Sequence, residues 1–428
     1  MSDSQLVPEW AVAELSSGNS SSRLAALLRS SQLSLRTLQL ATVARALTEP
    51  TEPTQPEQQD QPGQHGQQTD TEQAEIADAV AALRQLSRRA PNSYAEIALA
   101  PEVGMWLGYR LPEIHRDGAD WRGAVSTGHE LAALAAATAL RAGQDLQVTV
   151  AIRGGRIYLP TLGALPVPGV DRSGRIALRT RPELQLAPVG TADNSSRWQA
   201  RTGWRRPRQL SARAGDLPIR IALDDCSPYR TVYGTEVEDQ LDDVMAGEWA
   251  RHFADAWELI VRLARPDAEL MASGLLTSVV PLRPAADTRS TTVRDVVGGL
   301  SSTPPASGEE LALNVVHEFQ HSKLWALMRL LDLSEPEADR LRIRVPWRKD
   351  ARPPQGVLQG AFAFLGVAEF QIRLAAIRRD RPAMHQAAAL GQQVAAAVDE
   401  LEASGALTLA GFQVVTAIRR RLGTLSTT

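Results

Sequence analysis

The chain has 428 residues, of which 43% are hydrophobic and 22% charged, and its formal net charge is −3. These values are ordinary for a globular protein of one large domain or two packed domains. A charge this close to zero gives no reason to expect a nucleic-acid or membrane-surface partner. The single cysteine, Cys226, excludes a disulfide framework and an all-cysteine metal site formed within the chain.

The N-terminal residues and the apolar runs predict a cytoplasmic protein. Residues 1–10 include Asp3 and Glu9 and have no apolar segment, unlike a signal peptide. The longest apolar runs, such as residues 131–140, are too short to cross a bilayer. We therefore expect a cytoplasmic location and no membrane partner.

The first third of the chain alternates between helical patterns and one polar segment. Residues 1–48 are expected to form N-terminal helices, because apolar residues recur there at helical spacing. Residues 49–73 are rich in Pro, Gln and acidic residues and contain no basic or aromatic residue, which predicts a disordered linker. Helical spacing resumes over residues 74–145 and ends at Gly143, a typical helix C-cap.

The apolar period changes near residue 146. Residues 147–153 and 156–159 alternate around Gly154-Gly155, which predicts a hairpin, and further strands are expected at 174–178, 185–189 and 218–223. Residues 146–225 are thus a β-rich region. Helical patterns dominate residues 226–428, at 237–263, 309–333, 359–378 and 384–403. The fold class expected is α+β and helix-dominated.

One motif in this last region carries recognisable chemistry. His317-Glu318-x-x-His321 places two imidazoles four residues apart in a predicted helix, so both lie on one face and can bind one metal ion. Glu318 lies beside them and can hold or deprotonate a metal-bound water. The flanking residues are apolar, which favours a buried helix.

Two histidines do not complete a metal site. Zinc hydrolases and non-haem iron oxygenases both use a third protein ligand, commonly a carboxylate. Glu369, in the otherwise apolar helix predicted at 359–378, is the best candidate in the sequence. The alternative for Glu369 is an ordinary charge paired with Arg373 one turn later. Asp332 is a weaker candidate, because it can simply end its helix.

Between the two predicted helices lies a short segment, residues 345–356, rich in proline and cations. Arg348 and Arg352 are the residues in it that can clamp a carboxylate through paired hydrogen bonds. The alternative is a structural loop whose arginines pair with surface acids. The only two lysines of the chain, Lys323 and Lys349, fall in or near this part of the sequence. Helical geometry turns Lys323 about 200° from His321, which predicts a packing role.

At these residues the chain resembles the HEXXH motif domain family, whose members modify ribosomally synthesised peptides. The similarity is strongest over residues 317–324, 346–348 and 358–368, and extends to 128–143 and 153–163. It implies an iron(II)- and 2-oxoglutarate-dependent enzyme that uses dioxygen to hydroxylate side-chain β-carbons of a precursor peptide. It also implies that His317 and His321 bind the iron, and that Arg348 or Arg352 holds a carboxylate of 2-oxoglutarate.

Two other functions stay open. The HExxH pattern by itself favours a zinc metallopeptidase in which Glu318 activates water for amide cleavage. The third possibility is a non-catalytic peptide-binding protein that retains a structural zinc.

Overall fold

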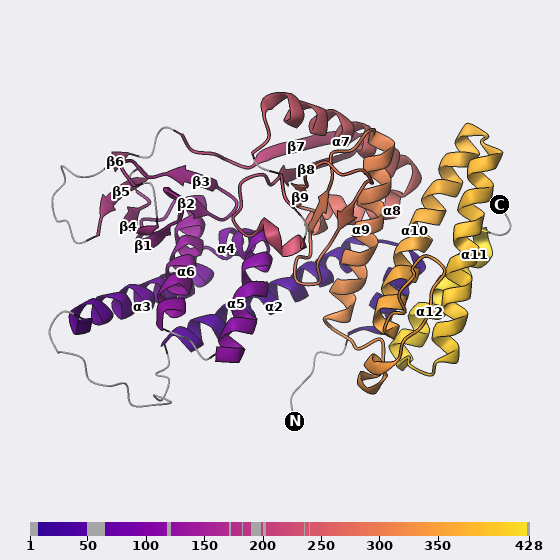
Figure 1. Cartoon of the computed structure of the whole chain (residues 1–428), viewed down its shortest axis with the longest axis horizontal. Coiled ribbons are helices and arrows are strands. Elements are labelled where there is room, and N and C mark those ends of the chain that lie inside the picture. Colours follow the sequence, from indigo (N-terminus) through magenta and orange to yellow (C-terminus); the bar gives the residue numbers. More distant parts are fainter. Residues whose placement is uncertain are drawn as a thin grey trace. The chain divides into compact units, whose positions relative to one another are not determined.

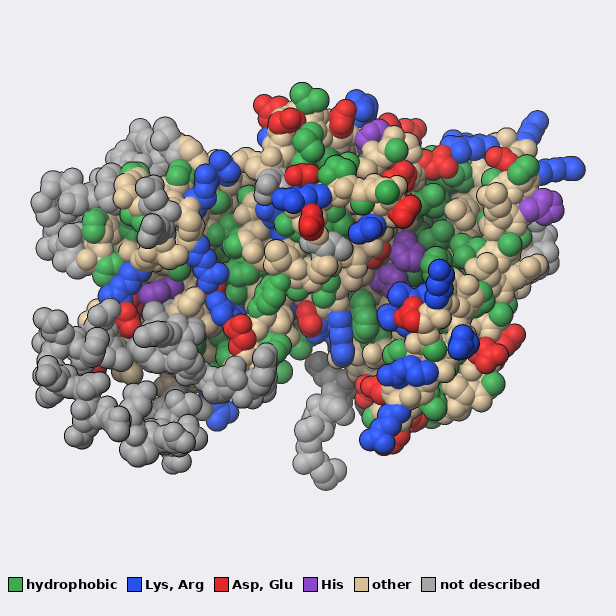
Figure 2. Space-filling model, viewed as in Figure 1, with side chains coloured by type: hydrophobic (Ala, Val, Ile, Leu, Met, Phe, Trp, Pro, Cys, Tyr) green, Lys and Arg blue, Asp and Glu red, His purple; other side chains and the backbone are tan. Residues whose placement is uncertain are grey.

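The structure is a computed structural model that describes residues 7–48, 65–117, 121–170, 173–181, 183–189, 198–199, 203–234, 236–238 and 240–425. The chain forms two compact units (Figure 1). Unit 1 comprises Met1–Gln32, Arg208–Leu223 and Thr235–Thr428, and unit 2 comprises Leu33–Pro207 and Asp224–Gly234. Cationic and anionic side chains are interspersed over the face shown in Figure 2. The prediction of a helix-dominated α+β fold is confirmed.

Unit 2 is helical in its first half and built of small sheets in its second. Its helices are the later part of α2 (Ser22–Thr48), α3 (His65–Arg89), α4 (Pro91–Ala98), α5 (Pro101–Asp117) and α6 (Trp121–Ala142). Its strands are β1 (Gln147–Ile152), β2 (Arg156–Leu159), β3 (Gly163–Pro166), β4 (Gly174–Arg179), β5 (Gln185–Pro188) and β6 (Trp198–Gln199). One antiparallel sheet has the order β1-β4-β5-β6, and β2 pairs with β3. Alternate residues of β1 and β4 pack with α6 into one apolar core.

The predicted hairpin at 147–159 is right in its turn and wrong in its pairing. Gly154 and Gly155 both have positive φ, as such a turn requires. Only Arg153 and Arg156 form a bridge across it. Beyond that bridge β1 pairs with β4 and β2 pairs with β3, so the two strands separate into different sheets.

Unit 1 contains the motif helix and one mixed sheet. Its helices are α1 (Glu9–Ser17), α7 (Asp243–Leu263), α8 (Arg265–Leu270), α9 (Gly308–Met328), α10 (Pro354–Arg378), α11 (Arg381–Ala403) and α12 (Leu409–Leu425). Its strands are β7 (Arg208–Ala214), β8 (Leu217–Leu223), β9 (Ser278–Pro281), β10 (Ser290–Thr291) and β11 (Gly299–Ser302). They form a sheet of order β10-β11-β9-β8-β7, with β10 at an edge. A single apolar core joins α7, α9, α10 and α12.

Local sequence explains where α9 and α10 begin and how closely they pack. The Ser307 side chain accepts a hydrogen bond from the backbone N–H of Glu310 and caps α9, and Pro354 occupies the first position of α10. At Gly366 of α10, a Cβ atom would lie 2.7 Å from the side chain of Gln320. The missing side chain therefore lets the two helices approach each other closely.

Helix α10 has the length and composition of a membrane-spanning helix, and 67% of its most apolar stretch is buried inside the structure. Its apolar residues pack against α7, α9 and α12 rather than facing outward. This is the pattern of a core helix that is apolar all round.

Two expected region boundaries differ from the structure. Helix α3 begins at His65, so residues 65–73 are helical and the linker expected at 49–73 was predicted too long; residues 49–64 lie outside the described residues. The β-rich region expected at 146–225 is divided, because β7 and β8 belong to the sheet of unit 1. Helix α12 was not predicted from the sequence.

Candidate functional site

Helix α9 brings the two motif histidines together. The Nε2 atoms of His317 and His321 lie 3.2 Å apart, and the two ring planes are inclined at 82°. Two imidazoles that each bind one ion at about 2.0–2.1 Å can have such a separation. The predicted juxtaposition of these two side chains is therefore present in the structure.

Helix α10 supplies a partner that orients one of the rings. The Nδ1 of His321 lies 2.9 Å from Oε1 of Gln359, whose amide nitrogen in turn contacts Sδ of Met328. An amide oxygen only accepts hydrogen bonds, so Nδ1 of His321 carries the proton and donates it. Its Nε2 then keeps a lone pair directed toward His317, which is the arrangement common among metal-binding histidines.

Burial determines the protonation of the motif. It lowers the pKa of His317 to about 3, with a further contribution from His321, and it lowers the pKa of His321 as well. Both rings are thus neutral near pH 7, the form that binds metals. Burial also raises the pKa of Glu318 to about 7, although Ser290 donates a hydrogen bond to its Oε1 at 2.8 Å.

The motif opens into a pocket of about 680 Å³ in unit 1. The pocket is formed by the motif helix, the edge strand β10, the segment before α10 and the first half of α10. It is lined by Ser290, Thr291, Thr292, His317, Glu318, His321, Trp325, Val345, Trp347, Arg348, Lys349, Asp350, Arg352, Gly356, Gln359, Gly360 and Phe364. Its size is that of a site for a small molecule or a segment of peptide.

The cationic segment before α10 borders this pocket. Its base is closed by two backbone hydrogen bonds of 2.8 Å between Ile343 and Arg352. Arg348 and Arg352 both line the pocket, yet each also pairs with Asp350, at 3.0 and 3.2 Å. The two arginine side chains are 47% and 42% exposed and so remain accessible to an anion from solvent. Both readings of these arginines, as clamp and as structural partners of an acid, are thus compatible with their positions.

Aromatic rings form one wall of the pocket. The ring of Phe364 lies with its centroid 5.0 Å from that of His317 and 5.0 Å from that of Trp347. Trp347 packs on Gly360, where a Cβ atom would come within 3.0 Å of the indole. The packing of α10 on α9 brings these two rings to the motif.

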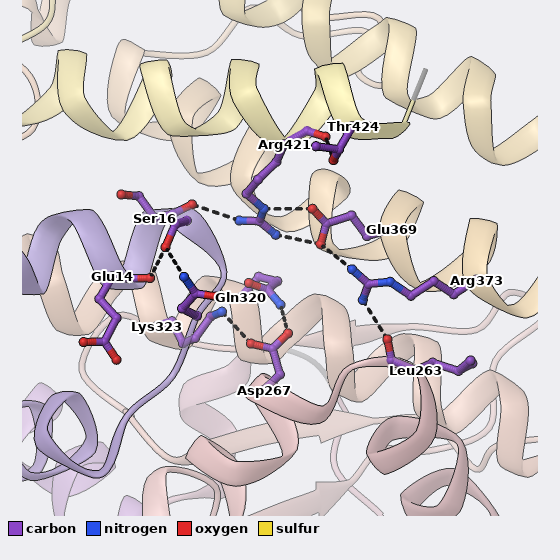
Figure 3. A network of polar contacts seen from close by, with 12 residues as sticks. Glu14, Ser16, Leu263, Asp267, Gln320, Lys323, Glu369, Arg373, Arg421 and Thr424 are labelled. Atoms are coloured by element: carbon purple, nitrogen blue, oxygen red, sulfur yellow. Dashed lines mark hydrogen bonds and ion pairs between the residues drawn. The ribbon is translucent and has the colours of Figure 1, made fainter. Parts of the chain in front are cut away.

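Glu369, expected as the third ligand, is engaged elsewhere. Its two carboxylate oxygens accept hydrogen bonds from Arg421 of α12 at 2.8 and 2.9 Å. Figure 3 shows Arg421 between Glu369 and Ser16, whose carbonyl oxygen accepts a further bond at 3.2 Å. Arg373 is a more distant partner at 3.9 Å, in agreement with the alternative reading of this residue. Glu369 does not line the motif pocket, so the structure does not bring the expected third ligand to the histidine pair.

The described residues bring together two side chains that could bind a metal ion, and no third. Among them no group of three His, Cys, Asp or Glu side chains is placed to hold a metal ion. Asp332 does not line the pocket, and it follows the end of α9. The two imidazoles of His317 and His321 can thus fill part of a coordination shell. Zinc hydrolases and facial-triad iron enzymes use three protein ligands, and the described residues do not form such a set.

The opposite face of α9 carries a buried polar network. Lys323, only 2% exposed, pairs with Asp267 of α8 at 2.6 Å, and Gln320 donates to the other oxygen of Asp267 at 2.7 Å (Figure 3). Burial lowers the pKa of Lys323. The expected packing role of Lys323, away from the motif histidines, is confirmed, whereas Lys349 is exposed at the pocket.

Unit 2 contains a second, smaller cavity of about 140 Å³. Glu130 lies at its wall and is bound by Trp106, Arg110 and Tyr229, together with Arg153. The adjacent residue, His129, pairs with Glu75. Sequence reasoning left this region unassigned, although a His-Glu pair inside an apolar helix was a signal that could have indicated it.

No protein-family model and no curated protein matches the chain. The resemblance to the HEXXH motif domain family therefore depends on the motif residues quoted from the sequence.

Proposed function

We propose that the protein is an iron(II)- and 2-oxoglutarate-dependent hydroxylase acting on side-chain β-carbons of a ribosomally made precursor peptide. The observation that carries the proposal is the convergence of His317 and His321, 3.2 Å apart and neutral, on a pocket bordered by arginines. In the overall reaction 2-oxoglutarate and dioxygen yield succinate and carbon dioxide, and one oxygen atom enters a C–H bond of the peptide. Iron(II) would supply the centre at which dioxygen is reduced.

The arginines at the pocket, rather than the number of protein ligands, favour this reaction over peptide cleavage. A zinc peptidase holds its ion by three protein ligands, and a structural zinc site uses four. The described residues supply two. A facial-triad iron oxygenase also uses three protein ligands, so the ligand count does not separate the two candidates. The accessible side chains of Arg348 and Arg352 do, because paired guanidinium groups suit a dicarboxylate co-substrate.

The chain's own residues have separate tasks in the proposed reaction. Gln359 fixes the tautomer of His321, and burial keeps both imidazoles neutral. Arg348 and Arg352 would exchange their contact with Asp350 for the distal carboxylate of 2-oxoglutarate, since a bidentate guanidinium contact suits that group. The remaining pocket, beside the edge strand β10, is wide enough for a peptide segment.

A specific observation also supports the peptidase as second candidate. Glu318 lines the pocket, is 3% exposed and has a pKa raised to about 7, which suits a general base near neutral pH. In a peptidase this carboxylate would take a proton from water, so its loss would abolish cleavage.

The test is turnover by the full chain prepared without oxygen and then supplied with iron(II), 2-oxoglutarate and dioxygen, with a peptide panel. We expect succinate and a peptide heavier by one oxygen. His317→Ala and His321→Ala should abolish both, because each removes half of the donor pair. Glu318→Gln separates the candidates: it should retain most succinate formation in a hydroxylase and should abolish cleavage of the same panel by zinc-loaded protein in a peptidase. Full succinate formation by His317→Ala would disprove the proposed function.

A further inference from the structure

Unit 2 contains a cavity of about 140 Å³ for which the proposed function has no use. Helices α5 and α6, strands β1, β2 and β3 and the segment 226–229 contribute to its wall. Most of the lining side chains are apolar or aromatic, and a few are charged. An engineered apolar cavity of about 150 Å³ holds benzene, so this one has room for about six non-hydrogen atoms.

One acid in this wall has no cation beside it. Glu102 of α5 is 7% exposed, and burial raises its pKa to about 7. Other residues give it two hydrogen bonds, from the backbone N–H of Thr161 at 2.7 Å and from the hydroxyl of Tyr158 at 3.4 Å, and both end on Oε1. No lysine or arginine in the described part of the chain forms an ion pair with Glu102. Its ionised form therefore lacks a counter-charge.

A second buried acid lies near Glu102. Asp224 is 3% exposed, and its Oδ1 accepts the backbone N–H groups of Cys226 and Ser227 at 3.2 and 2.9 Å. Its Oδ2 is buried without a hydrogen-bond partner among the described residues. The two acids are close enough that Asp224 contributes to the raised pKa of Glu102. Buried oxygen atoms without donors are rare in folded proteins, so this one indicates that a donor group is missing beside the cavity.

The remaining charged groups of the lining do not supply that donor. Arg153 pairs with Glu130, whose carboxylate is also bound by Tyr229. Arg156 begins strand β2 and forms no ion pair with either buried acid of the described chain. No three His, Cys, Asp or Glu side chains of the described residues are grouped as metal ligands, which favours an organic cation over a metal ion. The rings of Tyr158 and Tyr229, with centroids 6.3 Å apart in the same wall, add aromatic faces that attract cations.

We infer that the cavity binds a primary ammonium group on a short apolar stem, with the ammonium donating to Glu102 and the stem along the apolar wall. An ammonium group has three donors and a positive charge, which is what two buried acids require. Lysine carries this group on a four-carbon stem, which suits the volume of the cavity. The group can come from a free alkyl amine or from a lysine of a peptide, whose carbonyl oxygens would accept hydrogen bonds from Arg156. The inference does not depend on the histidine pair, which belongs to unit 1.

The experiment is a ligand-observed NMR titration of the full chain with n-butylammonium, with n-butyrate, and with two capped tripeptides that differ only in a central lysine or norleucine. We expect n-butylammonium to bind with a dissociation constant on the order of 1 mM. The lysine peptide should bind at least about tenfold more tightly than the norleucine peptide, which has the same stem without the charge. If the lysine peptide binds more tightly than n-butylammonium, a peptide is the source of the group; the reverse order identifies a free amine.

The affinity should rise with pH, because the ammonium group binds the ionised form of Glu102. Between about pH 6 and pH 8 the ionised fraction rises about tenfold, and the dissociation constant of n-butylammonium should fall by the same factor. The other titratable groups near Glu102 are Asp224, Tyr158 and Cys226. Burial raises the pKa of the tyrosine and of the thiol, so both stay neutral over this range. Glu102→Gln should remove most of the pH dependence.

The same variant tests the contact itself, because glutamine keeps an acceptor for the N–H of Thr161 and removes the charge. Glu102→Gln should weaken n-butylammonium binding about 10–100-fold, the usual worth of a hydrogen bond to a charged group. Asp145→Asn is the matched control: it removes an exposed carboxylate of the same unit outside the cavity lining and should leave the affinity unchanged. Ala133→Leu, which fills the cavity from α6 without changing its charge, should also block binding. It serves as the second variant should Glu102→Gln fail to fold, as judged by circular dichroism and thermal melting.

Three results would overturn the inference. Tighter binding of n-butyrate than of n-butylammonium would show that the arginines of the wall recognise an anion instead. Equal affinity of the unsubstituted chain and Glu102→Gln for n-butylammonium would show that the amine does not contact the buried acid. Absence of saturable binding by both n-butylammonium and the lysine peptide would exclude an amine site.

Discussion

Gln359 is the residue whose role at the site depends most on a single hydrogen bond. It is 4% exposed, and its Oε1 accepts the Nδ1 proton of His321 at 2.9 Å. Its other contact, to the sulfur of Met328, is a weak hydrogen bond. The bond to His321 is therefore the main interaction of the Gln359 amide. The bond fixes both the orientation and the tautomer of the ring.

Gln359→Leu is therefore expected to weaken Mn²⁺ or Co²⁺ binding by about 10–100-fold, the usual cost of losing a group that orients a metal-binding histidine. Calorimetric titration of the variant measures the change. Gln359→Glu, which keeps an acceptor, should retain most of the affinity, and Gln355→Leu, on the same helix but outside the pocket lining, serves as control. Equal affinities for the leucine and glutamate variants would exclude an orienting role.

At the scale of elements, the helices of unit 1 are joined behind the motif by paired buried charges. Arg421 of α12 is 10% exposed and Glu369 of α10 is 13% exposed, and the guanidinium also binds the carbonyl oxygen of Ser16 at the end of α1. Figure 3 shows this group and the Lys323–Asp267 pair in one network of polar contacts. Breaking such a pair from one side leaves a charge without a partner.

Glu369→Ala is thus expected to lower the free energy of unfolding of unit 1 by about 3–5 kcal/mol. Replacing both members, as Glu369→Leu with Arg421→Met, should restore much of that loss, because no unpaired charge remains. Urea unfolding measures these differences. Metal affinity of Glu369→Ala, measured under conditions where it is folded, should stay within about threefold of the unsubstituted chain, since the carboxylate binds Arg421 and no ion. A 100-fold loss of metal affinity in Glu369→Ala would show instead that Glu369 binds the ion.

At the scale of the whole molecule, we expect the stabilities of the two units to depend on different solution conditions. Unit 1 contains the histidine pair and should respond to metal, whereas unit 2 contains a buried carboxyl group, Glu102, that should respond to pH. Glu102 is 7% exposed and accepts the backbone N–H of Thr161 at 2.7 Å. Burial, together with the nearby Asp224, raises its pKa from 4.5 to about 7.

The sign of the resulting pH dependence follows from the raised pKa. The folded state holds the Glu102 proton more tightly than the unfolded state, so this contribution to stability is fully present below pH 4.5 and is lost as the pH rises through 7. The loss is on the order of 3 kcal/mol, at 1.36 kcal/mol for each unit of pKa. Glu102→Gln should therefore flatten the fall in unfolding free energy between pH 5 and pH 8, measured by urea unfolding. The exposed Glu96→Gln is the control, and an unchanged pH slope in Glu102→Gln would contradict the assignment.

The two units also show why the expected regions were only partly correct. Periodicity predicted most helices of the chain, because it records which residues of a segment are buried. It could not show that β7 and β8 join β9 and β11 in the sheet of unit 1, since strand pairing between distant segments leaves no local pattern. Helix α12 was missed although it has local signals: Gly405 has a positive φ beyond the end of α11, and Val414, Val415 and Ile418 recur at helical spacing.

The sequence by itself determined the chemistry that one helix can present. The spacing of His317 and His321 fixes their juxtaposition, because helical geometry places residues four apart on one face whatever surrounds the helix. The tertiary structure alone decided what meets that pair: Gln359 and Phe364 rather than Glu369, which the packing of α12 directs to Arg421. Contacts within one helix follow from 3.6 residues per turn, whereas contacts between α9, α10 and α12 follow from how their side chains fill the core.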